Sequence, residues 1–320
     1  MKPKSLYMRI FNILLTVAAY GYLVYRLVVF DGYAALADSW RMAGSVQWAC
    51  LLAAVLLVPL NVVCEAWKWQ TLLRDVEPMG IREAQRQVYY GYVGAFVTPY
   101  RAGDYPARVM LLSDSSVWSA AVALGLVGSL ALLVVEVCLG VPAVVLLANY
   151  ETGIDVRNVL IATAVVAVLI VLVPMCLKRL AQCEWRNKQL RRMFGALTQL
   201  TGQRFMKVVV ISLLRYVIWA VQLTLVLRFC GVVLPPVQLL LAIPTYYLLL
   251  GGVPSVPVAD VAVRGSLSIV VFGVFSPNTA GIAIAITIIW VINTLLPMVV
   301  GTWVGASGKY GISFTRRLTN

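Results

Sequence analysis

The sequence predicts an all-α polytopic membrane protein with about six transmembrane helices and two re-entrant helical hairpins in an inverted-repeat arrangement. Of its 320 residues, 61% are apolar and only 12% are charged. Several apolar runs approach or exceed the roughly 20 residues with which a helix crosses the hydrocarbon layer. The formal net charge of +13 is concentrated in particular loops, which indicates membrane topology and attraction to anionic lipid rather than a nucleic-acid partner.

The runs predicted to span the bilayer cover residues 6–30, 46–66, 117–148, 159–176, 207–230 and 279–304. The first run resembles a signal peptide, because basic residues precede it and a cleavage-like Ala-Leu-Ala follows it at 35–37. It is, however, longer than the roughly 7–15 residues of a typical signal core, and Arg26 interrupts it. We therefore expect a retained first span rather than a cleaved signal.

Two further apolar regions, 87–113 and 237–277, are interrupted near their middle by proline and glycine. The arm from Gln87 to Thr98 makes about 18 Å of helix, which is too short to cross the bilayer. We therefore expect the chain to enter the bilayer and return to the same side as a hairpin. The residues expected to break the two helices are Pro99, Gly103, Pro106, Pro254 and Pro257. The second region has longer arms, so two full crossings are an alternative there.

The distribution of lysine and arginine indicates the topology. The connections 31–45, 149–158 and 231–236 contain only Arg41 and Arg157, whereas the other loops and both ends are basic. With two re-entrant hairpins every basic loop falls on the cytoplasmic side, together with both termini. This predicts a multi-pass protein of the cell membrane, of the bacterial inner-membrane type.

The same topology divides one membrane domain, residues 1–320, into two halves. The first half is 1–176 with the hairpin 87–113, and the second is 207–320 with the hairpin 237–277. The basic cytoplasmic linker 177–206 joins them, either as an interfacial helix or as a solvated loop. The hairpins would enter from opposite faces, as in an inverted repeat.

The two predicted hairpin tips share a motif. They read PYRAGDYPAR at 99–108 and PSVPVADVAVRG at 254–265, and each places an aspartate four residues before an arginine. This spacing stacks an ion pair on one helix face. Because a helix start carries partial positive charge and arginine binds phosphate bidentately, the tips are candidate anion sites. Alternatively the pairs only lock the hairpins, but each charge in the bilayer centre costs about 2.5–3.5 kcal/mol, which favours a functional cavity.

Other charges lie inside the apolar runs. Arg215 is expected to bind substrate or an acidic side chain, or else to extend to the interface. Glu65 is expected to face the cavity, and Lys68 with its flanking tryptophans is interpreted as an interface anchor. For Glu136 a functional role and a structural hydrogen bond are equally well supported.

Several classes of chemistry are disfavoured. The chain has no histidine, its six cysteines include no C-x-x-C pair, and no paired-carboxylate metal signature or P-loop motif occurs. We therefore expect no metal site, no cofactor, no disulfide framework and no catalytic residues of the usual kinds.

The motifs together resemble a known family. N-x-x-x-E-x-W-K-W at 61–69, P-Y-R-A-G-D-x-x-x-R at 99–108 and P-V-A-D-V-A-V-R-G at 257–265 are similar to the lysylphosphatidylglycerol synthase transmembrane-region family. Its best-known members carry the flippase domain of the multiple peptide resistance factor. The resemblance covers roughly residues 5–305. Asp104 stands where the family usually has glutamate, and the second tip departs from the family's G-x-G-x-R-E-like core. The resemblance implies a stand-alone flippase-like domain without the transferase.

The leading hypothesis is therefore a translocator of an anionic or phosphate-bearing lipid. The residues expected to bind the headgroup are Arg101, Asp104, Arg108, Arg215, Asp260 and Arg264, with Glu65 and Glu136 as further cavity residues. The alternatives are a secondary transporter of a small anion, a membrane transferase acting on a lipid-linked phosphate with Asp104 or Asp260 as general base, and a structural membrane subunit.

Overall fold

Helices form all the regular structure that the computed structural model describes. It describes residues 43–98, 101–151, 188–252 and 260–306, together with isolated positions at 37, 40, 41, 157, 161 and 179. The predicted span 6–30, the predicted span 159–176 apart from position 161, and the predicted helix breakers Pro99, Pro254 and Pro257 lie outside these residues. Within them no strand occurs, and the all-α prediction is confirmed.

Four helical segments of the described residues are long and apolar enough to cross a membrane. They are α3 (Ser45–Leu73), α6 (Trp118–Glu151) with the short 3₁₀ turn η2 (Ser115–Val117), α9 (Gly202–Phe229), and the continuous run α12 (Thr279–Trp290), η3 (Val291–Leu295) and α13 (Leu296–Ala306). They coincide with the predicted spans 46–66, 117–148, 207–230 and 279–304. A multi-pass membrane protein is therefore confirmed in this coarse form.

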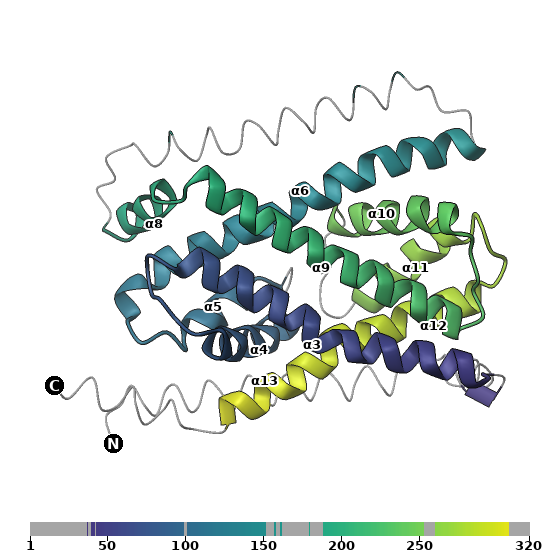
Figure 1. Cartoon of the computed structure of the whole chain (residues 1–320), viewed down its shortest axis with the longest axis horizontal. Helices are drawn as coiled ribbons and strands as arrows, with labels where there is room; N and C mark the ends of the chain where they lie inside the picture. Colours follow the sequence, from purple (N-terminus) through teal and green to yellow (C-terminus); the bar gives the residue numbers. More distant parts are fainter. Residues whose placement is uncertain are drawn as a thin grey trace.

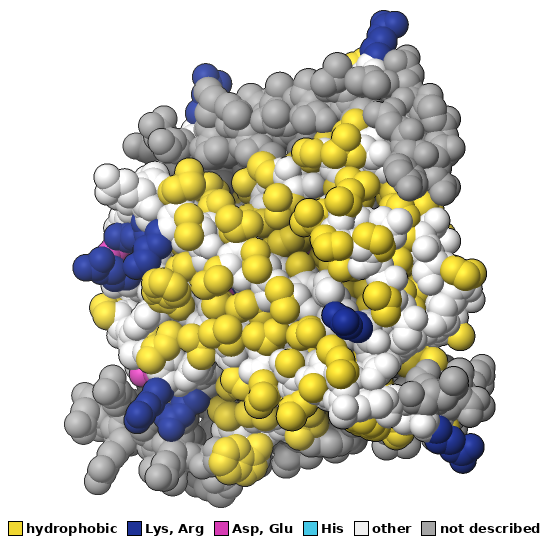
Figure 2. Space-filling view, turned by 45° about the vertical axis from the view of Figure 1, so that its right-hand side comes forward, with side chains coloured by type: hydrophobic (Ala, Val, Ile, Leu, Met, Phe, Trp, Pro, Cys, Tyr) yellow, Lys and Arg dark blue, Asp and Glu magenta, His cyan; other side chains and the backbone are white. Residues whose placement is uncertain are grey.

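The outer surface of these helices suits a hydrocarbon environment. Large apolar side chains such as Leu52 and Leu56 on α3, Val210 and Val217 on α9, and Trp303 on α13 are exposed. In the view of Figure 2 apolar side chains cover most of the described surface, and Lys and Arg side chains are few. A soluble domain rarely exposes so large an apolar area, whereas lipid tails accept it.

The start of α6 is fixed by a local cap. Asp114 accepts hydrogen bonds from the Ser116 amide at 2.7 Å and from its hydroxyl at 2.6 Å. These bonds lower the pKa of this exposed carboxyl, because they stabilise its ionised form. The cap ends the loop after α5 and begins the long apolar helix.

Two broken helix pairs lie where the sequence predicted interrupted helices. The first is α4 (Ile81–Val97) with α5 (Asp104–Val109), and the second is α10 (Pro236–Gly252) with α11 (Asp260–Phe272). The members of each pair pack on each other. In Figure 1 the two pairs lie toward opposite ends of the molecule, and α3 and α9 run side by side between them. Whether either pair is re-entrant in a bilayer stays a prediction.

The reversal between α4 and α5 depends on a threonine and two glycines. The Thr98 hydroxyl donates to the Gly94 carbonyl at 2.8 Å and accepts from the Gly103 amide at 2.7 Å. The backbones of Gly94 and Gly103 approach so closely that a Cβ on either would meet the other's carbonyl oxygen. Glycine is therefore required at both positions for α5 to fold back on α4.

The basic linker contains a short helix, α8 (Lys188–Thr198), which packs against α6. Ala196 is buried in this contact, while Arg191 and Arg192 are exposed. The Arg192 guanidinium donates to the Ser116 carbonyl at 2.9 Å, close to the start of α6. The helical alternative for the linker thus holds over residues 188–198, and its contact with a membrane surface stays a prediction.

Candidate functional site

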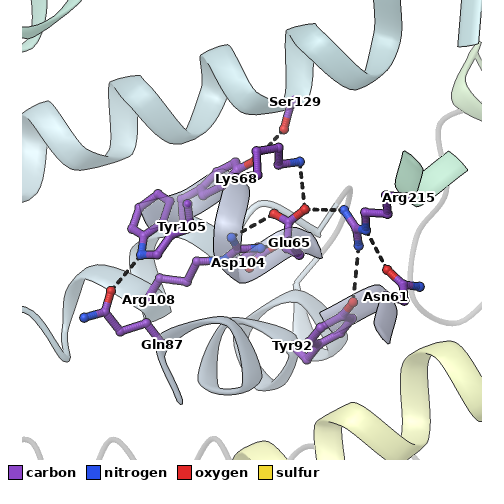
Figure 3. Close-up of polar contacts among 11 residues, drawn as sticks. Asn61, Glu65, Lys68, Gln87, Tyr92, Asp104, Tyr105, Arg108, Ser129 and Arg215 are labelled. Atoms are coloured by element: carbon purple, nitrogen blue, oxygen red, sulfur yellow. Dashed lines mark hydrogen bonds and ion pairs between the residues drawn. The ribbon is translucent and has the colours of Figure 1, made fainter. Parts of the chain in front are cut away.

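The polar residues of α3 face the interior of the protein. Asn61, Glu65 and Lys68 recur at helical spacing on one face, which points toward α5 and α9 (Figure 3). The exposed fraction of each of these three residues is 3% or less. The Lys68 ammonium lies 2.7 Å from Glu65 Oε2, so the two form a buried ion pair one turn apart. The prediction that Lys68 is an interface anchor is wrong, because Glu65 holds its ammonium inside.

The Glu65 carboxylate is the centre of a larger cluster. Its Oε1 accepts from Arg108 Nη1 at 2.9 Å, and its Oε2 accepts from Arg215 Nη1 as well as from Lys68. One carboxylate thus binds cations from α3, α5 and α9. Because a buried charge without a partner is very costly, these contacts tie the three helices together.

Arg108 is fully engaged. Its Nε and Nη2 donate to the two carboxylate oxygens of Asp104 at 2.7 and 2.9 Å, and its Nη1 donates to Glu65. The guanidinium also lies over the rings of Trp69 and Tyr105, with 5.4 and 4.9 Å to the centroids. The predicted Asp104–Arg108 ion pair is present, and each of the three guanidinium nitrogens of Arg108 already donates a hydrogen bond to a carboxylate.

Glycine at position 91 makes room for this pair. A Cβ there would meet Asp104 Oδ1, and it would lie 2.8 Å from Arg108 Cγ and Nε. The close approach of α5 to α4 therefore depends on Gly91 as well as on the glycines at the reversal.

Arg215 is also fully engaged and does not extend to the interface. It donates through Nη1 to Glu65, through Nε to Asn61 Oδ1 at 2.7 Å, and through Nη2 to the Tyr92 hydroxyl at 3.3 Å. Its guanidinium carbon lies 4.5 Å from the centroid of the Trp219 ring. Of the predicted alternatives, the acidic partner is the one present.

A chain of side-chain amides extends from the cluster into η3. Asn61 Nδ2 lies 3.4 Å from Asn293 Oδ1, and Asn293 Nδ2 donates to Gln222 Oε1 at 3.2 Å. Asn293 lies in the π-helical segment that joins α12 to α13, a kind of irregularity that is frequent at functional sites. Sequence reasoning missed the contacts of Asn293, Gln222 and Tyr92. For Asn293 and Gln222 the available signal was a single amide side chain inside a run of apolar residues.

The buried charge cluster, defined as Glu65, Lys68, Asp104, Arg108 and Arg215, is not neutral. By formal charge, its two carboxylates face three basic side chains. One positive charge is therefore uncompensated by the members of the cluster. Such a charge favours a nearby anion, because the protein interior screens it poorly.

Arg101 lies beside the cluster but outside it. It is exposed and makes no ion pair with any residue that the structure describes, while its guanidinium carbon lies 5.4 Å from the Tyr92 ring centroid. Its backbone has φ of 57°, in the left-handed region that a non-glycine residue rarely adopts. Such strain is typical of functional sites, where the surrounding structure holds it.

The second tip has a different environment. Arg264 Nε donates to Asp260 Oδ1 at 2.9 Å, as the spacing predicted, and Trp290 Nε1 donates to Asp260 Oδ2 at 2.9 Å. The Trp290 ring in turn lies 6.1 Å from the Phe96 ring near the end of α4. The two broken pairs are thus linked through Phe96 and Trp290.

The remaining predicted site residues are placed as follows. Gly103 precedes α5, and Pro106 occupies its first turn, where its missing N–H leaves no hydrogen bond unmade. Glu136 lies inside α6, is partly buried, and takes part in none of the ion pairs of the buried charge cluster. Among the described residues no group of His, Cys, Asp and Glu is arranged to hold a metal ion.

Comparison with known protein families identifies the family of the chain. The family model described as the lysylphosphatidylglycerol synthase TM region matches residues 11–301, nearly the whole chain. No curated protein matches the chain significantly.

Proposed function

Because the chain belongs to the lysylphosphatidylglycerol synthase transmembrane-region family, we propose that it is a flippase-like translocator that moves an anionic or phosphate-bearing lipid across the bilayer. The observation that carries this proposal is the uncompensated positive charge of the buried charge cluster, next to the exposed and strained Arg101. An anionic headgroup supplies the missing negative charge, while its acyl chains stay in the hydrocarbon.

The arginines differ in their proposed roles. Arg101 and Arg264 contact the headgroup, because their guanidinium groups are only partly engaged by described residues. Arg108 and Arg215 supply fixed positive charge and hold the helices together, because all their nitrogens are already bound. This narrows the earlier expectation that all four arginines contact the headgroup directly.

The proposed path of the lipid headgroup is based on the two broken helix pairs, α4 with α5 and α10 with α11. Both pairs are re-entrant, with their tips near the middle of the bilayer and both chain termini in the cytoplasm of the bacterial inner membrane. The two halves, 1–176 and 207–320, rock against each other and expose the tips to either side in turn. The contact between Phe96 and Trp290 is then one of those that must shift.

A membrane transferase is less well supported. The carboxylates assigned as candidate general bases, Asp104 and Asp260, both accept hydrogen bonds from arginine. Their oxygens are thus directed at guanidinium groups and are not free to approach a proton of a substrate. Both groups are better suited to orienting arginines than to removing a proton from a substrate.

The test compares leaflet transfer of fluorescent phosphatidylglycerol in vesicles that contain wild type, Arg101→Ala or Arg82→Ala. Arg82 is an exposed arginine at the start of α4 and serves as the matched control. Loss of one charge-assisted contact of about 1.5–3 kcal/mol predicts a slowing of at least about tenfold for Arg101→Ala. Equal rates for all three folded proteins contradict the assignment.

Wild type that transfers none of the lipids tested contradicts lipid translocation itself. In that case binding of inorganic phosphate to wild type and to Arg101→Ala tests the small-anion alternative. Phosphate bound by wild type and not by Arg101→Ala would favour a transporter of a soluble anion.

A further inference from the structure

Glu136 lies at the contact between α6 and the end of α10. One turn further along α6, Gly140 lets the two backbones approach, since a Cβ there would lie 2.9 Å from the Pro244 carbonyl oxygen. Glu136 Oε2 itself is 3.3 Å from the point that a Cβ on Gly251 would occupy. Gly251 is the penultimate residue of α10, so the carboxyl lies beside the helix end that leads to the second tip.

The position is unusual for a carboxylate. Glu136 is inside a long apolar helix, and no cation of the described residues lies within ion-pair distance of it. The last carbonyl groups of α10 have no partners within their helix and carry partial negative charge. They repel an ionised carboxylate, whereas a protonated acid can donate a hydrogen bond. An ionisable residue in such a place is a candidate for function.

The charged and titratable groups around Glu136 come from three helices. Lys68 of α3 and Arg215 of α9 act electrostatically on its carboxyl, and both belong to the buried charge cluster. Tyr216 of α9 and Tyr247 of α10 also lie within electrostatic range. The Tyr216 hydroxyl is buried and has no hydrogen-bond partner among the described residues.

The other helices that pack on α6 hold their charges elsewhere. On α5, Arg108 and Asp104 bind each other and Glu65. On α8, Arg192 binds the Ser116 carbonyl near the start of α6. The electrostatic neighbours of Glu136 are therefore chiefly the cations of the cluster and the end of α10, which act on it in opposite senses.

We propose that Glu136 is a proton-binding site that couples lipid movement to protons. When ionised, it supplies the negative charge that the buried charge cluster lacks, and when protonated, it leaves that positive charge to the anionic headgroup. The carboxylate takes one proton from water on one side and returns it to water on the other, and no other bond changes. The inference rests on the proposed function, since it assigns a coupling ion to the same site.

The coupling is reciprocal. If a proton on Glu136 strengthens binding of the anion, the bound anion must strengthen binding of the proton by the same factor. Proton and anionic lipid therefore cross in the same direction. A proton gradient directed toward one leaflet would accumulate the lipid there.

The first test measures the proton directly and needs no lipid movement. Infrared titration of the reconstituted protein detects the carbonyl stretch of protonated carboxylic acids. Wild type is compared with Glu136→Gln and with Glu83→Gln, a control at a partly buried carboxyl in the first turn of α4. We expect a pH-dependent band that Glu136→Gln lacks and Glu83→Gln keeps. The same band in all three proteins overturns the proposal.

The second test measures transfer of fluorescent phosphatidylglycerol under an imposed pH gradient. For wild type we expect the rate of lipid transfer to rise about tenfold for each unit by which the pH falls, in the range where the carboxyl is mostly ionised, as for any single titrating group. Glu136→Gln, which mimics the protonated form, should transfer lipid without responding to the gradient. A response that persists in Glu136→Gln overturns the proposal.

The two tests separate this inference from the proposed function. If wild type transfers no lipid but the infrared band disappears in Glu136→Gln, the proton site stands and lipid translocation fails. If wild type transfers lipid and neither the band nor the gradient response depends on Glu136, translocation stands and the coupling fails.

Discussion

Replacement of Glu65 by glutamine should destabilise the protein more than any other single conservative change in the cluster. The amide keeps the shape of the side chain but removes the negative charge to which Lys68, Arg108 and Arg215 bind. It also leaves one acceptor oxygen where there were two. All these groups are buried, so water cannot take over the lost contacts.

The magnitude follows from the number of cations affected. Removing one partner of a single buried ion pair typically costs about 3–5 kcal/mol. Arg108 keeps Asp104 and Arg215 keeps its amide and hydroxyl partners, whereas Lys68 has no other carboxylate among the ion pairs of the described residues. We therefore expect a loss of about 5 kcal/mol, at the upper end of that range. Since stabilities of native proteins are about 5–15 kcal/mol in total, Glu65→Gln should be close to unfolding.

The assay is thermal unfolding in detergent, followed by the loss of the monodisperse peak in size exclusion. Glu83→Gln is the control. The double variant Glu65→Gln, Arg215→Gln should recover part of the stability, because one unpaired cation is removed, and the two single losses should not add. A midpoint for Glu65→Gln equal to that of Glu83→Gln, or strictly additive losses in the double variant, would refute the assignment of Glu65 as the centre of the cluster.

Three further changes test the packing in the same unfolding assay. Gly301→Ala puts a Cβ against a backbone carbonyl of α4 and should lower stability by about 1–3 kcal/mol. In the control Gly265→Ala the added Cβ meets nothing within 4 Å, so stability should stay the same or rise. Equal effects of the two changes would contradict the close contact of α13 with α4. Trp290→Phe removes the indole donor to Asp260 and should cost about 1.5–3 kcal/mol, and an unchanged midpoint would argue against that bond. Asp75→Asn breaks a partly exposed ion pair and should change stability by less than about 1 kcal/mol, so a loss as large as that of a buried pair would be unexpected.

The membrane class and the long helices were predictable from the sequence because the thickness of the bilayer fixes the length of an apolar run. The ends of the helices were not. The second predicted span stops at residue 66, whereas α3 continues to Leu73. The extra turns contain Lys68, Trp69 and Gln70, which a hydropathy pattern assigns to the interface. They stay in the helix because Glu65 pairs with the lysine and Gln87 accepts from the indole of Trp69 at 2.6 Å.

For the site, the sequence predicted local pairs and missed distant ones. Asp104–Arg108 and Asp260–Arg264 are four residues apart, so helix geometry alone brings their side chains together. The contacts of Glu65 with Arg108 and Arg215 join residues 43 and 150 positions apart. No local pattern encodes such separations, and the Trp-Lys-Trp pattern around Lys68 pointed to the membrane interface instead.

The two similar motifs therefore differ in what they can do. The Arg108 side chain is 3% exposed, and Asp104 and Glu65 bind all its nitrogens, whereas the Arg264 side chain is 23% exposed, with its Nε on Asp260. An arginine that keeps part of its hydration loses less when it exchanges a carboxylate for a phosphate. Headgroup contact should therefore form and break at Arg264, as it does at Arg101, while Arg108 supplies a charge that stays in place. If so, Arg264→Lys should raise the lipid concentration needed for half-maximal transfer without unfolding the protein, whereas Arg108→Lys should lower the unfolding midpoint.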